Sequence, residues 1–319
     1  MKKNFKYESF KLNFKNKTVL VTGASKGIGF EISKSFLKCG ANLLICSSNK
    51  RNIFSSYKKL KKIKKSSQKL FYLKADVSNV KDVKKFINFA IKKFKKIDIL
   101  INNAGVYGPI GDIEKINWNA WIKAISINLF GSVLLCKEIM PYLKKKNSGK
   151  IIQLSGGGAA SPAPRISAYS VSKAAIVRFV ENLVAEVKNY KIYINAVAPG
   201  AINTGMLDTV LKAGPKKLGT YYFKKAQKQK KLGGSSIKDA CDLILFLASK
   251  YSDGINGKLI SALWDDWKNF PKYKKILKKS DIYNLRRISS FDRGYTWGQA
   301  TKKSIYDISL SSFKKNKKI

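Results

Sequence analysis

The chain has 319 residues, a formal net charge of +45 at pH 7 and no histidine. The absence of histidine excludes Ser-His-Asp hydrolases, zinc sites with imidazole ligands, and dehydrogenases that use histidine as their acid or base. Any proton transfer must therefore use a tyrosine, lysine, cysteine or carboxylate side chain.

Lysine supplies almost all of the positive charge, because only six of the 64 basic residues are arginine. A protein that recognises nucleic acid is expected to gather basic residues on one face and to use arginine for base edges. The lysines here occur in every segment, so a general lysine bias explains them more simply, and no specific nucleic-acid partner is expected. A polyanion-binding role stays open as an alternative. The positive field should attract anionic substrates or acidic carrier proteins.

The apolar runs and the cysteines indicate a cytoplasmic protein. The longest runs, such as Ala41–Cys46 and Ile97–Ile101, have the length of strands and are too short to span a membrane. Residues 1–17 lack the apolar centre of a signal peptide. The four cysteines are scattered without a C-x-x-C pair, which favours reduced structural thiols. No metal site is expected.

Short apolar runs alternate with longer amphipathic segments from residue 17 to residue 261. Strands are expected at Thr18–Val21, Asn42–Cys46, Leu70–Lys74, Ile97–Ile101, Lys150–Leu154, Ile192–Val197 and Lys258–Ile260. Helices are expected at Gly27–Lys38, Val80–Phe94, Trp118–Leu143 and Ala168–Val187, among others. This alternation predicts βαβ units. We expect an α/β fold with a Rossmann-type, doubly wound parallel sheet of about seven strands and helices on both faces.

The chain divides into three parts by this pattern. Residues 1–16 form a polar leader, residues 17–262 form a single Rossmann-type domain, and residues 263–319 form a C-terminal extension. The extension breaks the alternation and is rich in aromatic and charged residues, which argues against a simple disordered tail.

The segment Thr22–Gly29 follows the first expected strand and opens the first expected helix. Gly23 allows a tight turn, Gly27 lets the backbone approach a pyrophosphate, and Gly29 allows close packing of helix on strand. The N-terminus of the helix then offers free N–H groups and the positive end of its dipole to phosphates. The segment therefore predicts a phosphate-binding turn.

This turn resembles the T-G-x-x-x-G-x-G turn of the short-chain dehydrogenase/reductase family, and further motifs follow in the family's order between residues 17 and 262. The matching segments are Asp76-Val77, Asn102-Asn103-Ala104-Gly105, Asn128, Tyr169-Ser170-Val171-Ser172-Lys173, and Pro199-Gly200 with Ile202 and Thr204. The resemblance implies a hydride-transferring oxidoreductase that assembles as a homodimer or homotetramer. It also implies cofactor contacts from Gly23, Ser25, Lys26, Gly27, Ile28, Gly29, Ser47, Ser48, Asp76, Val77, Asn103, Ala104, Gly105, Tyr169, Lys173, Pro199, Gly200, Ile202 and Thr204.

By the same resemblance, Tyr169 is the expected proton donor or acceptor, and Asn128 helps to hold a water relay. Other Y-x-x-x-K matches occur in this lysine-rich chain, but only Tyr169 follows the fifth strand and its glycine-rich turn. The spacing of four places Lys173 on the same helical face as Tyr169. The lysine ammonium, together with the positive nicotinamide, should lower the pKa of the phenol.

The position of the family's catalytic serine differs in this chain. Thirteen residues before Tyr169, the family's usual distance, the residue is Gly156, and the nearest hydroxyl belongs to Ser155. A shift of one residue on a strand turns a side chain to the opposite face. The three glycines that follow could rotate the backbone, so we expect Ser155 to polarise the substrate carbonyl. The alternative is that Ser155 faces the sheet and that Tyr169 and a backbone N–H hold the carbonyl.

Residues at the end of the second strand are expected to determine whether NAD or NADP binds. NAD-dependent enzymes place an acidic residue there for the ribose 2′-hydroxyl. This chain has Ser47, Ser48 and Asn49 instead, and Lys26 lies in the glycine turn. We therefore expect NADP, while NAD stays open because Lys26 also fits the general lysine excess.

The substrate is expected to be a small carbonyl compound or secondary alcohol, either an acyl thioester on an acidic carrier protein or a sugar derivative. A non-catalytic protein that binds the cofactor on the same fold is the alternative. The extension is expected either to lie near the substrate cleft or a subunit contact, with Arg286 or Arg287 available to an anionic group, or to cover the surface without contacting a ligand.

Overall fold

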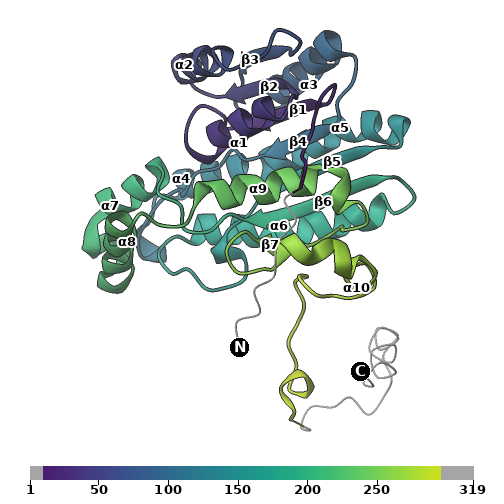
Figure 1. Cartoon of the computed structure of the whole chain (residues 1–319). Helices are drawn as coiled ribbons and strands as arrows, with labels where there is room; N and C mark the ends of the chain where they lie inside the picture. Colours follow the sequence, from purple (N-terminus) through teal and green to yellow (C-terminus); the bar gives the residue numbers. More distant parts are fainter. Residues whose placement is uncertain (1–9, 296–319) are drawn as a thin grey trace. The chain divides into compact units, whose positions relative to one another are not determined.

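Seven parallel strands form one sheet in the computed structural model, which describes residues 10–295. Their order across the sheet is β3-β2-β1-β4-β5-β6-β7 (Figure 1). The strands are β1 (Thr18–Thr22), β2 (Asn42–Ser47), β3 (Leu70–Lys74), β4 (Ile99–Asn102), β5 (Gly149–Leu154), β6 (Ile192–Ala198) and β7 (Leu259–Ser261). Each predicted strand lies within two residues of these bounds, and the predicted doubly wound α/β fold is confirmed.

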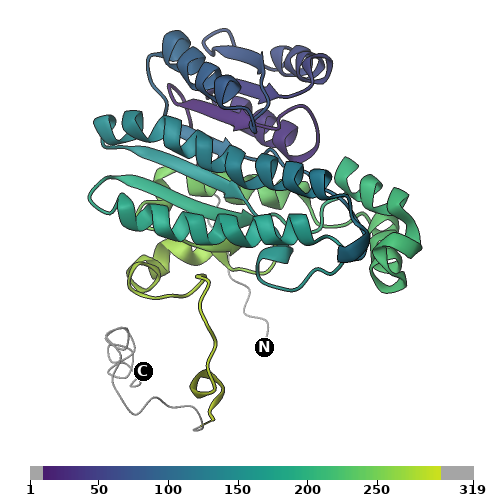
Figure 2. The same cartoon turned by 180° about the vertical axis from the view of Figure 1, so that it is seen from behind.

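Helices cover both faces of the sheet. One face carries α1 (Gly27–Lys38), α2 (Lys50–Lys61) and α9 (Ile237–Ala248), which lie in front in Figure 1. The other face carries α3 (Val80–Phe94), α5 (Gly131–Lys146) and α6 (Ser167–Glu186), which lie in front in Figure 2. Because successive strand residues point to opposite faces, Val19 and Val21 join the first core, whereas Leu20 joins the second.

The predicted helix over Trp118–Leu143 is interrupted at Asn128. The structure has α4 (Trp118–Ile125), then a π-helical turn over Ser126–Phe130, and then α5. Within residues 10–295 this continuous stretch, Trp118–Lys146, is the one that is long and apolar enough to cross a membrane. Its residues Leu135, Ile139 and Leu143 are buried in the core against the sheet, so we interpret it as a core helix.

The chain reverses its direction of winding between β1 and β4. From β1 the sheet grows through β2 to β3, and from β4 it grows the other way to β7. In open α/β sheets the crevice at such a reversal, outside the carboxyl ends of the strands, is where ligands bind. The ends of β1 and β4, at Thr22 and Asn102, therefore mark the expected site.

Two helices after β6, α7 (Gly205–Leu218) and α8 (Thr220–Leu232), form a small apolar cluster of their own. Its buried members are Leu207, Val210, Leu218 and Ala226. Partly buried residues from other segments, Tyr107, Ile110 and Ile166, pack against it together with Leu211, Tyr222 and Phe223. This cluster connects the helix pair to the loop that follows β4.

The first part of the C-terminal extension packs on the domain. Trp267 and Phe270 are buried in the first core, and Leu277 of the short helix α10 (Lys274–Lys279) joins them. The backbone N–H of Leu259 in β7 donates to the carbonyl of Tyr283 at 2.8 Å, so the extension covers the edge strand. The compact unit therefore continues to Leu285, beyond the boundary predicted at residue 262, and a second unit begins at Arg286.

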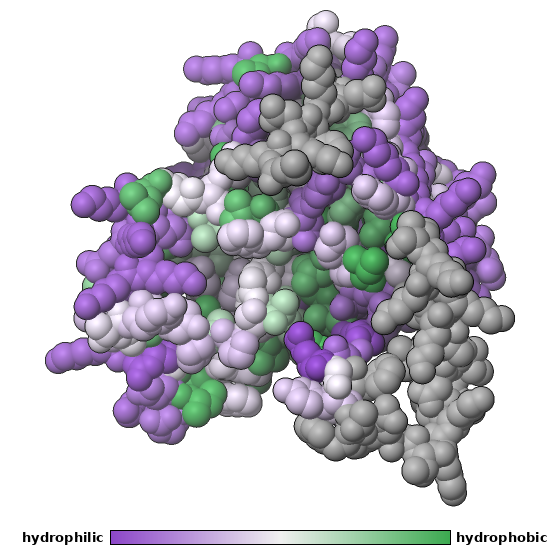
Figure 3. All heavy atoms as spheres, turned by 60° about the horizontal axis from the view of Figure 1, so that its bottom comes forward, coloured by the Kyte–Doolittle hydropathy of each residue, from purple (hydrophilic) through white to green (hydrophobic). Residues whose placement is uncertain are grey.

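Hydrophilic side chains cover much of the face that Figure 3 shows, and separate hydrophobic groups lie among them. The four cysteines are all free thiols, as expected for reduced structural cysteines.

Candidate active site

The glycine turn forms a cradle with no room for side chains. Gly23 has a φ of +63°, and a Cβ there would lie 2.7 Å from Cα of Ala104. A Cβ at Gly29 would overlap the carbonyl of Gly23 and the side-chain amide of Asn103. The backbone N–H groups at the start of α1 are consequently open to a close ligand, as a pyrophosphate requires.

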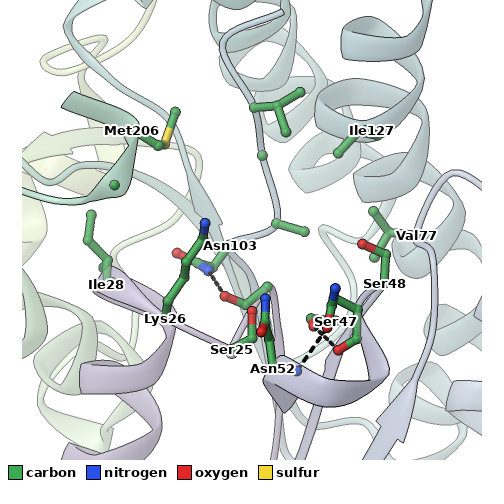
Figure 4. A pocket seen from close by; sticks show the side chains of 18 of the residues that line it. Ser25, Lys26, Ile28, Ser47, Ser48, Asn52, Val77, Asn103, Ile127 and Met206 are labelled. Carbon is green, nitrogen blue, oxygen red and sulfur yellow. Dashed lines mark hydrogen bonds between the residues drawn. The ribbon is translucent and has the colours of Figure 1, made fainter. Parts of the chain in front are cut away.

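The side chain of Asn103 braces this turn from β4. Its Nδ2 donates to the carbonyl oxygens of Thr22 at 2.9 Å and Gly23 at 3.1 Å (Figure 4). In return, Thr22 Oγ1 accepts from the backbone N–H groups of Asn103 and Ala104, each at 3.1 Å. These bonds couple the two strand ends at the point where the winding reverses.

A cavity of about 400 Å³ opens over the cradle. The predicted cofactor residues that line it are Gly23, Ser25, Lys26, Gly27, Ile28, Gly29, Ser47, Ser48, Asp76, Val77, Asn103, Ala104, Gly105 and Thr204. The lining also includes residues that the sequence reasoning missed, namely Asn49, Asn52, Ala75, Val106, Lys123, Ile127, Gly205 and Met206. Several are direct neighbours of predicted residues, including Ile127 beside Asn128, whereas Lys123 belongs to no motif and lies in α4. The cavity and its cradle fit a dinucleotide.

One end of the cavity has Ser47, the last residue of β2, with Ser48 and Asn49 after it, and none of the three is a carboxylate. The Asn49 side chain caps the N-terminus of α2, because its Oδ1 accepts from the N–H of Asn52 at 2.9 Å (Figure 4). Lys26 is exposed at the start of α1, and its Nζ lies 3.8 Å from the place where a Cβ of Gly205 would be. Within residues 10–295, Lys26 forms no ion pair.

Asp76 lies on the same rim after β3. Its carboxylate accepts from the N–H and hydroxyl of Ser78 at 2.9 and 2.7 Å, and Lys123 Nζ lies 3.2 Å away. Partial burial acts to raise the pKa of Asp76, but the bonds from Ser78 and the Lys123 ammonium outweigh it, so the pKa is lowered. Asp76 is therefore a fixed, ionised acceptor.

Asn128 is buried in the π-helical turn and holds the loop after β4. Its Oδ1 accepts from the N–H of Val106 at 2.8 Å, and its Nδ2 donates to the carbonyl of Val106 and to the Ser172 hydroxyl, both at 2.9 Å. A π-helical turn at this position is typical of functional sites. The side chain of Asn128 thus connects the loop to α6, where Tyr169 and Lys173 lie.

Tyr169 and Lys173 occupy one face of α6, as their spacing predicts. The ammonium lies 5.6 Å from the centre of the Tyr169 ring. A Cβ at Gly105, which lines the cavity, would lie 3.6 Å from Lys173 Nζ and 3.3 Å from Asn128 Oδ1. Tyr169 and Lys173 are not among the lining residues themselves, but Lys173 and Asn128 flank the cavity directly behind Gly105.

Without the cofactor, burial determines the direction of the Tyr169 pKa. Burial, with a smaller contribution from the neighbouring Tyr107, raises the pKa of the Tyr169 phenol above its usual range. Burial also lowers the pKa of Lys173, to about 8. The low-polarity surroundings disfavour the charged forms of both side chains.

Gly156, and not Ser155, faces Tyr169. A Cβ at Gly156 would lie 2.8 Å from the Tyr169 hydroxyl oxygen. The backbone of Gly156 is extended, so the side chain of the preceding Ser155 points to the opposite side. Ser155 is buried, and its hydroxyl donates to the carbonyl of Lys173 at 3.1 Å. The structure therefore does not place Ser155 as the expected carbonyl donor, because the glycines do not rotate its side chain into the cleft.

The remaining predicted residues lie elsewhere. Pro199, Gly200 and Ile202 follow β6 without lining the cavity, and Ile202 forms an isolated bridge with Gly234. In the second unit, Arg286 pairs with Asp292. Residues 296–319 of the extension lie outside the described residues.

Comparisons with known proteins agree with this geometry. A family model described as short chain dehydrogenase matches residues 17–214. Dehydrogenase/reductase SDR family member 4 of Caenorhabditis elegans is 30% identical over 254 residues, which cover 77% of this chain and 94% of that protein. The structure of NAD⁺-bound xylitol dehydrogenase has a TM-score of 0.72 at 22% identity, covering 78% of this chain and 98% of that one.

A structure of actinorhodin polyketide ketoreductase with NADPH is also similar, with a TM-score of 0.70 at 21% identity over 77% of this chain and 95% of that one. The likeness to these two structures concerns the fold, whereas the family model and the relative cover the motif-bearing sequence itself. The chain belongs to the short-chain dehydrogenase/reductase family of oxidoreductases.

Proposed function

We propose that the protein transfers a hydride between a nicotinamide cofactor and a carbonyl or secondary-alcohol substrate. The observation that carries this proposal is the position of Lys173 and Asn128 behind Gly105, at the wall of a cavity whose glycine cradle fits a dinucleotide. Tyr169 lies on the same face of α6 and presents its hydroxyl to Gly156. A cofactor-binding protein without turnover would not need this constellation.

The bound cofactor supplies the hydride chemistry, and the chain's residues position the groups and move the proton. Tyr169 gives its proton to the substrate oxygen during reduction. Its raised pKa keeps the phenol protonated at neutral pH, which suits this direction. Lys173 holds positive charge beside the phenol and would bind the ribose of the cofactor, and Asn128 fixes the loop that carries Val106.

We also propose NADP as the preferred cofactor. The end of β2 offers hydroxyl and amide groups from Ser47, Ser48 and Asn49 but no carboxylate that would repel a 2′-phosphate. The exposed ammonium of Lys26 is free to approach that phosphate.

The substrate class follows from the surroundings of the site. Tyr107, which packs on the Tyr169 ring, also packs against the apolar cluster of α7 and α8. These apolar surroundings favour a substrate with an apolar group beside its carbonyl, such as a 3-oxoacyl thioester, over a sugar derivative. The lysine-rich surface agrees with delivery on an acidic carrier protein.

We further propose that the enzyme works in the cytoplasm as a homo-oligomer. Residues 263–285 cover the β7 edge, so helical faces remain for subunit contact. Light scattering on the purified protein tests the oligomeric state.

The experiment that tests the proposed function follows NADPH oxidation with acetophenone and with S-acetoacetyl-N-acetylcysteamine, a small thioester. Reduction by the wild type and its loss in Tyr169→Phe are expected. Cofactor binding without reduction of a broad set of ketones and thioesters would instead support a binding protein on the same fold.

A further inference from the structure

The chain lacks a side chain where the substrate oxygen needs a second hydrogen-bond donor. The Tyr169 hydroxyl faces Gly156, which carries none, and the nearby Ser155 hydroxyl already donates to the Lys173 carbonyl. A carbonyl oxygen that gains charge in the transition state benefits strongly from a second donor. If the proposed function holds, another group must supply it.

The side chain of Tyr107 packs directly on the Tyr169 ring. The two ring centres are 4.7 Å apart, with the ring planes tilted by 50°. Among residues 10–295 the Tyr107 hydroxyl has no hydrogen-bond partner, although its ring is partly buried. A phenol that stays unpaired in such surroundings is available to a ligand.

The backbone holds Tyr107 firmly in this place. On one side, Asn128 binds both the N–H and the carbonyl of Val106. On the other side, Gly108 has a φ of +74°, and a Cβ there would lie 2.7 Å from the Ala124 Cβ. Two tight constraints therefore flank Tyr107, and catalytic donors need such fixed positions.

Tyr107 also keeps its proton over the neutral range, because burial raises the pKa of its phenol. It can therefore donate a hydrogen bond without taking part in proton transfer. Tyr169 remains the group that loses its proton.

We propose that Tyr107 is a catalytic hydrogen-bond donor that supplies, from the loop after β4, the hydroxyl that this chain lacks at Gly156. In reduction, the hydride adds to the carbonyl carbon, and the π electrons move to the oxygen. The oxygen takes the proton of Tyr169, while Tyr107 donates a hydrogen bond to it and keeps its own proton. This inference rests on the proposed function.

The first test compares kcat/KM for the two compounds named above with NADPH. Tyr107→Phe should lower kcat/KM by about a hundredfold, because it removes a donor that acts in the transition state. The Kd for NADPH should stay the same. Tyr72→Phe is the matched control, since it removes the hydroxyl of a partly buried tyrosine of β3 outside the site, and it should leave the rate unchanged. A rate for Tyr107→Phe equal to that of the control overturns the inference.

The second test asks whether a hydroxyl at residue 156 replaces that of Tyr107. In the Tyr107→Phe background, Gly156→Ser should be about tenfold faster than Gly156→Ala, because both carry the same Cβ close to the Tyr169 hydroxyl and only serine adds a donor. Equal rates for the serine and alanine variants would mean that a hydroxyl at this position has no effect, and they would overturn the proposal.

A third measurement does not depend on turnover. In the Tyr169→Phe background, which removes turnover, the Kd of acetophenone for the NADPH complex measures binding of the carbonyl directly. Adding Tyr107→Phe should weaken this binding several-fold by removing a donor to the carbonyl oxygen, and further addition of Gly156→Ser should strengthen it again. An unchanged Kd overturns the inference even if the wild type reduces neither compound, an outcome that separately counts against the proposed function.

Discussion

The Lys173 ammonium donates to the carbonyl oxygen of Leu154 at 2.6 Å, so a buried lysine of α6 is anchored on the end of β5. This bond holds the charged group between the helix that carries Tyr169 and the strand that leads to Gly156. Burial without a carboxylate partner explains the lowered pKa of Lys173, about 8.

The first prediction concerns pH. Because Lys173 is charged below its pKa and neutral above it, cofactor affinity and kcat/KM should fall as pH rises through about 8. Lys173→Met should weaken cofactor binding and lower turnover together, and it should abolish the fall in both quantities above pH 8. A pH profile of NADPH affinity for both proteins checks it, and an identical profile in the variant would contradict the assignment.

The same group affects stability. In the folded protein the Lys173 pKa lies below its ordinary value of 10.5, so the fold disfavours the ammonium. The charged Lys173 therefore lowers the free energy of unfolding by its full amount below pH 8. This destabilisation decreases as pH rises from about 8 toward 10.5, because the native state loses the lysine proton at a lower pH than the unfolded state does. Lys173→Met should therefore unfold at higher denaturant than the wild type at pH 7, with a smaller difference at pH 10.

The second prediction is that Tyr169→Phe loses nearly all hydride transfer. The ring still packs on Tyr107, so the fold and the cofactor site should persist, but no proton reaches the substrate oxygen. Steady-state turnover checks the loss of hydride transfer, and NADPH titration by fluorescence checks that the cofactor site persists. Retention of more than about a tenth of the wild-type rate, with chemistry rate-limiting, would contradict the role of Tyr169.

The third prediction concerns cofactor choice. NADPH should bind more tightly than NADH, and Lys26→Glu should narrow or reverse this preference by repelling the 2′-phosphate. Lys34→Glu, at the exposed face of the same helix where Lys34 pairs with Glu31, is the charge-matched control. Calorimetric titration of both cofactors decides, and a preference of the wild type for NADH would refute the proposal.

The fourth prediction reverses the sequence-based expectation for Ser155. Since its hydroxyl is bonded to the Lys173 carbonyl, Ser155→Ala should leave turnover near normal. The loss of one buried hydrogen bond should lower the free energy of unfolding by about 1 kcal/mol. A fall of two orders of magnitude in kcat would restore Ser155 as the carbonyl donor.

The fifth prediction concerns the extension. Trp267 is buried and contacts Phe246 of α9, with ring centres 5.6 Å apart. Trp267→Ala should lower the free energy of unfolding by about 3–5 kcal/mol. Trp264 is 83% exposed, so Trp264→Ala should change it by less than about 0.5 kcal/mol. Urea unfolding of both variants checks this, and equal effects would show that residues 263–285 are not part of the core.

Local sequence was sufficient for the elements and for the cofactor cradle. Strands such as β2 and β4 are mainly apolar, and the alternation of strand and helix allows few topologies. Gly29 lies against the carbonyl of Gly23 and Gly23 has a positive φ, so these features of the turn could be predicted from its own residues. The close approach of Gly23 to Ala104, in contrast, is a contact with the segment after β4. The motif order from Thr22 to Thr204 was sufficient to indicate the family.

The sequence by itself determined the fold class, the phosphate-binding turn and the pairing of Tyr169 with Lys173 on one helical face. Only the tertiary structure decided what surrounds them. Three contacts join segments far apart in the chain. They are the hydrogen bond from Ser155 to Lys173, the packing of Tyr107 on Tyr169, and the packing of Trp267 on α9. The direction of the Tyr169 pKa also depends on burial by these segments, because solvation is a property of the packed surroundings and not of the motif.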